Sequence, residues 1–263
     1  MEDAHVIDLT GQVALVTGSS RGLGRSHALT LAAAGADVIV HDIREGAAAE
    51  FGEARSGSAV GEEIVALGRR SGFLAADLTA PDQVAALVER ATAMFGKIDI
   101  LVNNAGGDIG ARTPRPDPNN ALDIDDDDIR AVVDRNLLTT MYMCKYVGRH
   151  MRERRSGKIV NIGSGVGHMP TELGIIYASA KAGVSHYTRC LGEEMRPFGV
   201  NVNCLSPSPT ATGRFLATRA LQDQSHLSHL QRVNQPEDMA RLVLFLASPL
   251  SDALTGETVV CWY

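Results

Sequence analysis

Short apolar runs alternate with longer segments of helical character along most of this chain. The apolar runs are rich in residues that favour strands, and they lie at 12–17, 36–41, 73–76, 98–102, 159–162, 200–205 and 258–261. The helical segments fall between them, at 24–34, 61–70, 81–95, 129–155, 175–195 and 236–247. This order predicts an α/β fold in which parallel strands are joined by right-handed helical crossovers.

The length and composition fit one domain spanning 1–263, because an α/β domain can reach this size without splitting. Hydrophobic residues make up 44% of the chain, and the net charge of −6 argues against a nucleic-acid-binding surface. No apolar run approaches the length of a membrane span, and the N-terminal MEDAHVID is too polar for a secretory signal. We therefore expect a cytoplasmic protein with no membrane partner.

The cysteines and histidines lack the spacings of metal sites. The four cysteines are scattered without a C-x-x-C pair, and the eight histidines show no H-x-x-x-H pattern. We expect reduced cysteines, mostly in the core, and no metal ion.

A glycine-rich turn joins the first expected strand to the first expected helix. It reads Gly18-Ser19-Ser20-Arg21-Gly22-Leu23-Gly24. Glycines let the backbone approach a phosphate closely, and a helix N-terminus offers free N–H groups and a positive dipole end. Strand, glycine turn and helix in this order predict a nucleotide-phosphate loop. An ordinary glycine-rich turn is the alternative.

Asp42 stands at the end of the second expected strand, eighteen residues after Gly24. This is near the position of an acid that binds a ribose 2′-hydroxyl, and a carboxylate there repels a 2′-phosphate. Asp42 therefore favours NAD over NADP. Arg21 and Arg44 lie close enough in sequence to pair with a 2′-phosphate instead, and a turn or helix-cap acid is the structural alternative for Asp42.

Three segments are irregular. Residues 43–58 are expected to form an extended, partly mobile loop before the next helix, and 107–128 borders the expected substrate pocket. The acidic run DIDDDD near the end of 107–128 best fits a solvated helix start, with a metal site as the sharper alternative. Residues 213–233 are polar and suggest a lid over the substrate, where His226 and His229 are expected to be solvated rather than catalytic.

The segment 158–181 brings three reactive side chains together. Ser164 follows the fifth expected strand, and Tyr177 and Lys181 are four residues apart, on one face of the next helix. A free phenol has a pKa of about 10, and a nearby ammonium favours the phenolate. The tyrosine can then exchange a proton with an alcohol while the serine holds the reacting oxygen. The alternative is an ordinary pair on the helix surface.

These motifs together resemble the short-chain dehydrogenase/reductase family over nearly the whole chain. The family's Thr-Gly-x-x-x-Gly-x-Gly appears as 17–24 and its Asn-Asn-Ala-Gly as 103–106. Its active-site asparagine, serine, tyrosine and lysine appear as Asn136, Ser164, Tyr177 and Lys181. The resemblance implies a Rossmann-like, doubly wound, three-layer fold with a seven-stranded parallel sheet, and a homotetramer or homodimer.

The resemblance also implies roles for these residues. Tyr177 would be the general acid/base, Lys181 would lower its pKa and bind the nicotinamide ribose, and Asn136 would anchor a water that links Lys181 to solvent. From its neighbours in the sequence alone, Asn136 is predicted to be a buried core residue that is hydrogen-bonded to a backbone carbonyl. The implied nicotinamide-cofactor contacts, with Asp77 at the adenine ring, are Gly18, Arg21, Gly22, Leu23, Gly24, Asp42, Asp77, Leu78, Asn104, Ala105, Gly106, Tyr177, Lys181, Pro207, Thr210 and Thr212.

The sequence departs from the family pattern at three places. The usual Pro-Gly is Pro207-Ser208, and serine resists a positive φ. The segments after Asp42 and after 103–106 are longer than usual. The C-terminus lacks the common Asp-Gly-Gly and instead ends in an aromatic tail that contains Trp262. This tail either packs on a neighbouring subunit or closes its pocket, or it simply packs at the sheet edge.

We therefore predict an NAD-dependent oxidoreductase that interconverts a secondary alcohol and a ketone, with a lid at about 207–235. Polar segments near the pocket favour a polyol, a sugar acid or a cyclic alcohol. One alternative is an NADPH-dependent carbonyl or 3-oxoacyl reductase that uses Arg21 and Arg44. Another is a nucleotide-sensing protein without turnover, which would have no need of Tyr177.

Overall fold

The computed structural model describes residues 7–52, 56–218 and 233–262. Its centre is a seven-stranded sheet in the order β3-β2-β1-β4-β5-β6-β7, and every neighbouring pair is parallel. Its strands are β1 (Val13–Val16), β2 (Asp37–Asp42), β3 (Ser71–Ala75), β4 (Ile100–Asn103), β5 (Gly157–Ile162), β6 (Val200–Ser206) and β7 (Thr258–Val260). The order reverses between β1 and β4, where ligands bind in doubly wound sheets.

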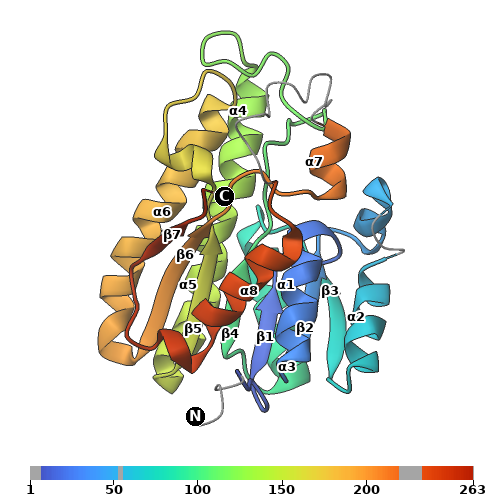
Figure 1. Ribbon diagram of the computed structural model, residues 1–263, viewed down its shortest axis with the longest axis vertical. Coiled ribbons are helices and arrows are strands. Elements are labelled where there is room, and N and C mark those ends of the chain that lie inside the picture. Colours follow the sequence, from blue (N-terminus) through green and yellow to red (C-terminus); the bar gives the residue numbers. More distant parts are fainter. Residues whose placement is uncertain (1–6, 53–55, 219–232, 263) are drawn as a thin grey trace.

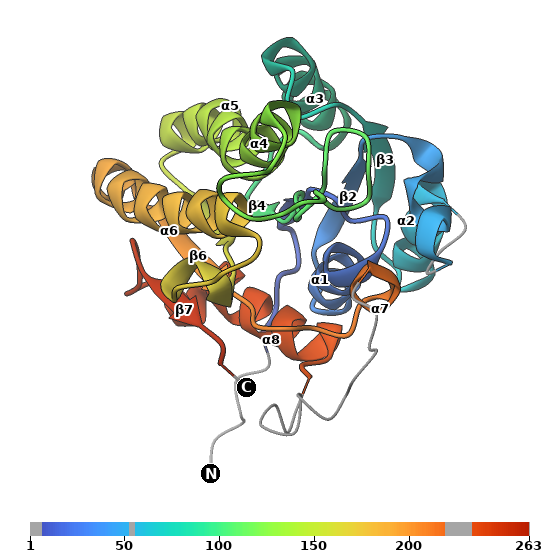
Figure 2. The ribbon, with the colours of Figure 1, turned by 90° about the horizontal axis from the view of Figure 1, so that it is seen from above.

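Helices cover both faces of the sheet, so the fold has three layers (Figure 1). Seen from above, α1, α2 and α8 lie on one side and α3, α4, α5 and α6 on the other (Figure 2). The α-helices are α1 (Gly22–Ala33), α2 (Gly57–Ala66), α3 (Pro81–Phe95), α4 (Asp126–Val133), α5 (Thr139–Arg154), α6 (Ile175–Met195), α7 (Gly213–Thr218) and α8 (Pro236–Ala247). The short 3₁₀ and π elements are η1 (Glu45–Phe51), η2 (Asp134–Leu138), η3 (Gly165–His168), η4 (Arg196–Phe198) and η6 (Pro249–Ser251).

Alternate residues of each strand supply the two cores. In β1, Val13 and Leu15 pack with α3, α5 and α6, whereas Ala14 and Val16 pack with α1, α2 and α8. Successive side chains of a strand point to opposite faces, and a strand that is covered on both faces is therefore apolar throughout. This confirms the predicted doubly wound, seven-stranded parallel architecture. No helix in the described part of the chain is long and apolar enough to span a membrane.

The predicted loop over 43–58 is wrong. Residues Glu45–Phe51 form η1, and α2 begins at Gly57 and ends at Ala66, earlier than the predicted 61–70. Ser56 caps α2, because its side chain accepts a hydrogen bond from Ala59 N at 3.1 Å. A Cβ on Gly57 would lie 2.2 Å from the ring of Phe73. The glycine that suggests a loop in the sequence therefore allows helix α2 to pack against β3.

The predicted single helix over 129–155 is also wrong in detail. The helical run begins at Asp126, and the π-turn η2 separates α4 from α5. The predicted capping by the acidic run is confirmed, since Asp125 accepts a hydrogen bond from Asp127 N at 2.8 Å and acids fill the first turn. Asn136 lies within the π-turn, a distortion that is frequent at functional sites.

We predict that buried histidines make the fold sensitive to acid. His27 is fully buried without a hydrogen-bond partner for either ring nitrogen, and burial lowers its pKa from 6.5 to about 3. The unfolded chain therefore takes up a proton as the pH falls below 6.5, whereas the folded protein does not until about 3. Each such histidine removes up to about 1.4 kcal/mol of unfolding free energy per pH unit in this window.

The test compares urea unfolding of the wild type and His27→Leu at pH 7.5 and pH 5.5. We expect the variant to lose about 1 kcal/mol less than the wild type between the two values. His186 is exposed, so His186→Leu is the matched control and keeps the wild-type difference. An identical loss in His27→Leu and the wild type would contradict the prediction.

Candidate active site

The glycine loop packs tightly against the end of β1. Gly18 and Gly22 have φ values of +61° and +56°, which favour glycine. A Cβ on Gly24 would lie 2.2 Å from Gly18 O. Arg21 is the N-cap residue of α1, and its own side chain makes no cap hydrogen bond. A close-packed glycine turn at a helix N-terminus fits the pyrophosphate of a dinucleotide.

Two side chains from neighbouring strands clamp this loop. Asn104 Nδ2 donates to Thr17 O at 3.0 Å and to Gly18 O at 3.1 Å. His41 Nδ1 lies 3.3 Å from Gly18 N, and its Nε2 lies 3.2 Å from Ala76 O. Burial lowers the pKa of His41 to about 4, so the ring is neutral, with Nδ1 accepting and Nε2 donating. The role of His41 is not predicted from the sequence. The one indication in the sequence is that His41 directly precedes Asp42.

Asp42 lines the cavity at the end of β2. Its carboxylate accepts hydrogen bonds from Ser20 Oγ and from Ile43 N, the second at 2.8 Å. Arg21 lies 3.5 Å from Glu50 and 4.5 Å from the centre of the Phe51 ring, so an acid and an aromatic ring already engage it. Arg44 is exposed and lines the same cavity. The Asp42 carboxylate therefore lines the cavity. Of the two arginines that the sequence suggests for a 2′-phosphate, Arg21 is already paired with Glu50.

The predicted cofactor residues line one cavity of about 720 Å³, which extends from Asp42 to Tyr177. Asp77 Oδ1 accepts hydrogen bonds from Thr79 N and Thr79 Oγ1, at 2.9 and 2.7 Å. The predicted cofactor-binding residues that line this cavity are Gly18, Arg21, Gly22, Leu23, Gly24, Asp42, Asp77, Leu78, Asn104, Ala105, Gly106, Tyr177, Lys181, Pro207, Thr210 and Thr212. The irregular segment after 103–106 also borders it, as the sequence predicts.

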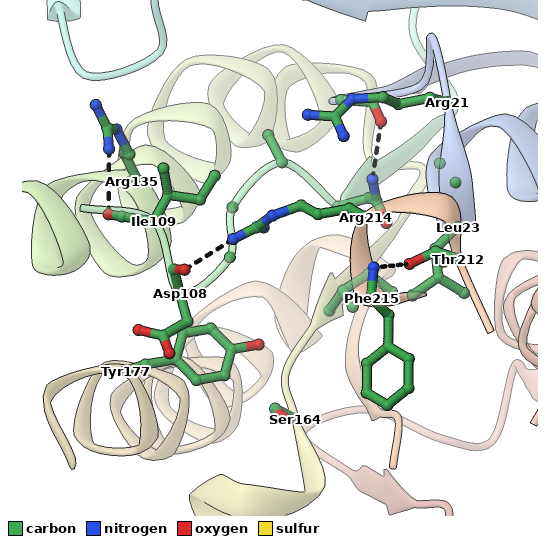
Figure 3. A pocket seen from close by; sticks show the side chains of 18 of the residues that line it. Arg21, Leu23, Asp108, Ile109, Arg135, Ser164, Tyr177, Thr212, Arg214 and Phe215 are labelled. Atoms are coloured by element: carbon green, nitrogen blue, oxygen red, sulfur yellow. Dashed lines mark hydrogen bonds between the residues drawn. The ribbon is translucent and has the colours of Figure 1, made fainter. Parts of the chain in front are cut away.

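Ser164, Tyr177 and Lys181 meet at the far end of this cavity. Ser164 lies two residues after the end of β5 and is the N-cap residue of η3, and the other two residues lie on α6. Figure 3 shows the Tyr177 ring and Ser164 entering the same pocket from these two elements. Lys181 Nζ lies 5.8 Å from the centre of the Tyr177 ring and donates to Ile162 O at 2.7 Å. Burial lowers the pKa of Lys181 to about 8.

Asn136 holds the backbone that follows the Asn-Asn-Ala-Gly motif. Its Nδ2 donates to Gly107 O at 2.9 Å and to Val132 O at 2.8 Å, and its Oδ1 accepts from Gly107 N at 2.8 Å. The side chain is fully buried and satisfied, as expected for a core asparagine. Asn136 does not line the cavity directly. It fixes the position of Gly106 and Gly107, which do.

The turn after β6 forms without a glycine at the position of Ser208. Ser208 takes no positive φ. Its carbonyl accepts from Thr210 Oγ1 at 2.9 Å and its Oγ accepts from Asn234 Nδ2 at 2.8 Å. These bonds hold the turn in place of the missing glycine. Of the predicted lid, α7 is described, whereas His226 and His229 lie outside the described residues.

An arginine from α7 crosses to the opposite wall of the cavity, which the sequence analysis did not foresee. Arg214 Nη2 donates to Asp108 O at 2.7 Å, as Figure 3 shows. A Cβ on Gly107 would lie 1.9 Å from the Arg214 guanidinium, so the side chain rests on the glycine backbone. The Asp108 carboxylate in turn accepts from Arg115 at 3.1 Å and Asn119 at 2.8 Å. These contacts fasten the irregular segment beside α6.

The described residues do not support a metal site. In the part of the chain that the structure describes, no group of three or more His, Cys, Asp or Glu side chains is placed to hold a metal ion. The acidic run at 123–128 serves instead as the start of α4.

Known proteins resemble this chain in sequence and in fold. The family model for short chain dehydrogenases matches residues 12–222. A cyclohexanol dehydrogenase of Rhodococcus sp. strain TK6 is 39% identical over 96% of this chain and 95% of its own. The 3-oxoacyl-acyl-carrier-protein reductase FabG of Chlamydia pneumoniae is 34% identical, over 97% and 96%. A 7α-hydroxysteroid dehydrogenase complexed with NADH and 7-oxo glycochenodeoxycholic acid superposes with a TM-score of 0.87 at 28% identity, over 99% and 96%.

We predict that Gly24→Ala abolishes tight dinucleotide binding. The added Cβ would overlap Gly18 O and Asn104 Nδ2, at 2.2 and 2.6 Å, and would push the loop out of place. Overpacking of this kind costs about 1–3 kcal/mol, and if the whole cost falls on the bound state, NADH affinity drops by about 5- to 150-fold. Gly148→Ala is the matched control, because its Cβ would meet only Met195 at 3.8 Å. Equal NADH dissociation constants for both variants, measured by calorimetry, would contradict the assignment of the loop.

Proposed function

The chain belongs to the short-chain dehydrogenase/reductase family of oxidoreductases, and from that premise we propose that it oxidises an alicyclic secondary alcohol to the ketone with NAD⁺. The observation that carries the proposal is the convergence of Ser164, Tyr177 and Lys181 at one end of a cavity whose other end presents Asp42. A candidate proton-transfer group and a candidate dinucleotide site would thus share one cavity, as alcohol dehydrogenation requires.

The cofactor choice rests on Asp42. Its carboxylate lines the cavity at the end of β2, where it can accept hydrogen bonds from a ribose diol and repels a 2′-phosphate. Arg21, which might otherwise pair with a phosphate, faces Glu50 and the ring of Phe51. The NADH complex of the 7α-hydroxysteroid dehydrogenase is consistent with this choice. When bound, the nicotinamide of NAD⁺ would serve as the hydride acceptor.

The residues of this chain would handle the proton. Ser164 would donate a hydrogen bond to the reacting oxygen, and Tyr177 would take the hydroxyl proton as the carbon–hydrogen bond breaks. Lys181 would favour the phenolate of Tyr177 by its positive charge. Its own hydrogen bond to Ile162 O fixes the ammonium at the end of β5. Asn136 would act at a distance, by holding Gly106 and Gly107 in the cavity wall.

The alicyclic substrate is the member of the predicted set that best fits the pocket lining. Apolar side chains form part of the lining, and Val166, Met169, Phe215 and Trp262 all contribute to it, together with charged groups such as Arg214 and Asp108. These apolar surfaces would bind a carbon ring better than a polyol or sugar acid, which has little apolar area to bury. The 39% identity to a cyclohexanol dehydrogenase over 96% of the chain supports the same choice.

The activity test follows absorbance at 340 nm during oxidation of cyclohexanol with NAD⁺. We expect turnover with NAD⁺ and a kcat/KM at least about tenfold lower with NADP⁺, the equivalent of about 1.4 kcal/mol of discrimination. The competing function, a 3-oxoacyl reductase, is tested with acetoacetyl-coenzyme A and NADPH. Faster reduction of that thioester, with no oxidation of cyclohexanol, would overturn the proposal.

We predict that Tyr177→Phe separates binding from turnover. The ring remains but the phenol oxygen is lost, so kcat should fall by about 10²–10⁴-fold, the usual contribution of a general acid or base. The NADH dissociation constant should stay within about twofold, because most cofactor contacts lie elsewhere in the cavity. Tyr142→Phe on α5, which does not line the cavity, is the control. Retained kcat in Tyr177→Phe would exclude this residue as the proton-transfer group.

A further inference from the structure

The C-terminal tail is fastened beside the active site. Strand β7 pairs with β6, and beyond its end Cys261 N donates to Ser206 O at 3.0 Å. Ser206 is the last residue of β6 and directly precedes Pro207. The hydrogen bond therefore fixes the next residue, Trp262, next to the turn that lines the cavity.

The indole ring of Trp262 lies over the residue that follows Ser164. A Cβ on Gly165 would lie 3.7 Å from Cζ3 of the indole and 3.5 Å from Pro207 O, which are ordinary contact distances. Gly165 N also donates to Pro207 O at 2.7 Å. Glycine at this position thus lets the aromatic ring approach the backbone of the serine segment. Trp262 itself lines the cavity.

Trp262 keeps surface available for a ligand. Its side chain is 44% exposed in the protein chain. The side chains of Val166, Met169 and Phe215 line the same cavity, and Figure 3 shows the Phe215 ring on the side of the pocket where Ser164 lies. The indole face and these side chains give the cavity apolar surface among its polar groups.

We propose that Trp262 is a specificity-determining residue, which binds the carbon ring of an alicyclic secondary alcohol while Ser164 and Tyr177 engage its hydroxyl. This inference rests on the proposed function. A six-membered carbocycle removes a large apolar area from water when it packs on an indole face. A short acyclic alcohol whose hydroxyl occupies the same place has too few carbons to cover that face. Trp262 therefore selects the alcohol substrate by its shape and apolar area, and other residues carry out the proton transfer.

The first test compares two substrates in Trp262→Ala, Trp262→Phe and the wild type. In Trp262→Ala we expect the KM for cyclohexanol to rise about tenfold, or about 1.4 kcal/mol. The kcat for cyclohexanol and the KM for 2-propanol should both stay within about twofold. Trp262→Phe should recover most of the loss, because it restores an aromatic face. Leu250→Ala is the control, since Leu250 is 55% exposed and does not line the cavity.

The two failures are distinguishable. If the wild type oxidises cyclohexanol and Trp262→Ala has an unchanged KM, the inference is wrong and the proposed function stands. An equal rise in KM for both alcohols, accompanied by weaker NADH binding, would mean that Trp262 has only a structural role. If the wild type oxidises no alicyclic alcohol, the proposed function fails and the inference fails with it.

The second test uses the fluorescence of Trp262, which is the one tryptophan in the sequence. The Tyr177→Phe variant with saturating NAD⁺ is titrated with cyclohexanol, so that the complex forms without turnover. We expect a saturable change in tryptophan emission, with a midpoint near the wild-type KM for cyclohexanol. Titration with 2-propanol should leave the emission unchanged. Unchanged emission at cyclohexanol concentrations that saturate the wild-type enzyme would overturn the proposal.

Discussion

The end of β1 is the constraint on which the rest of the site depends. The backbone of 18–24 must fold tightly enough for Gly24 to touch Gly18 O, and that geometry leaves no space for a Cβ. Asn104 from the end of β4 and His41 from β2 fasten the turn from either side. Because the three strands are neighbours in a parallel sheet, their ends meet at one edge. The tight conformation of this loop therefore depends on the sheet order as well as on its glycines.

The same edge carries side chains whose polar groups are already fixed within the protein. Lys181 donates to Ile162 O, and Asn136 exchanges hydrogen bonds with Gly107. Such groups need little rearrangement when a ligand arrives, which lowers the cost of reaching a reactive geometry. Burial of Lys181 lowers its pKa to about 8, so its charge responds to pH within the working range of an enzyme. Arg214 and Asp108 extend this fixed framework to α7 and the irregular segment.

Much of this fold follows from local sequence patterns. The helices 81–95, 175–195 and 236–247 begin and end where the sequence predicts, because proline starts and apolar periodicity are local signals. The error over 43–58 came from reading glycines as loop residues, whereas Gly57 is required by the ring of Phe73, a contact between distant parts of the chain. The positions of Arg214 and Trp262 depend in the same way on tertiary packing. No spacing rule in the sequence brings either residue into the cavity.

We propose that the cavity accepts a dinucleotide whose adenosine ribose carries no 2′-phosphate. Titration of the wild-type protein with NADH and with NADPH, by calorimetry at one ionic strength, tests this most directly. The account predicts that NADH binds at least about tenfold more tightly, since the Asp42 carboxylate would accept from the ribose hydroxyls and repel a 2′-phosphate. Equal or tighter binding of NADPH would contradict it and would assign Arg44 the leading part in cofactor recognition.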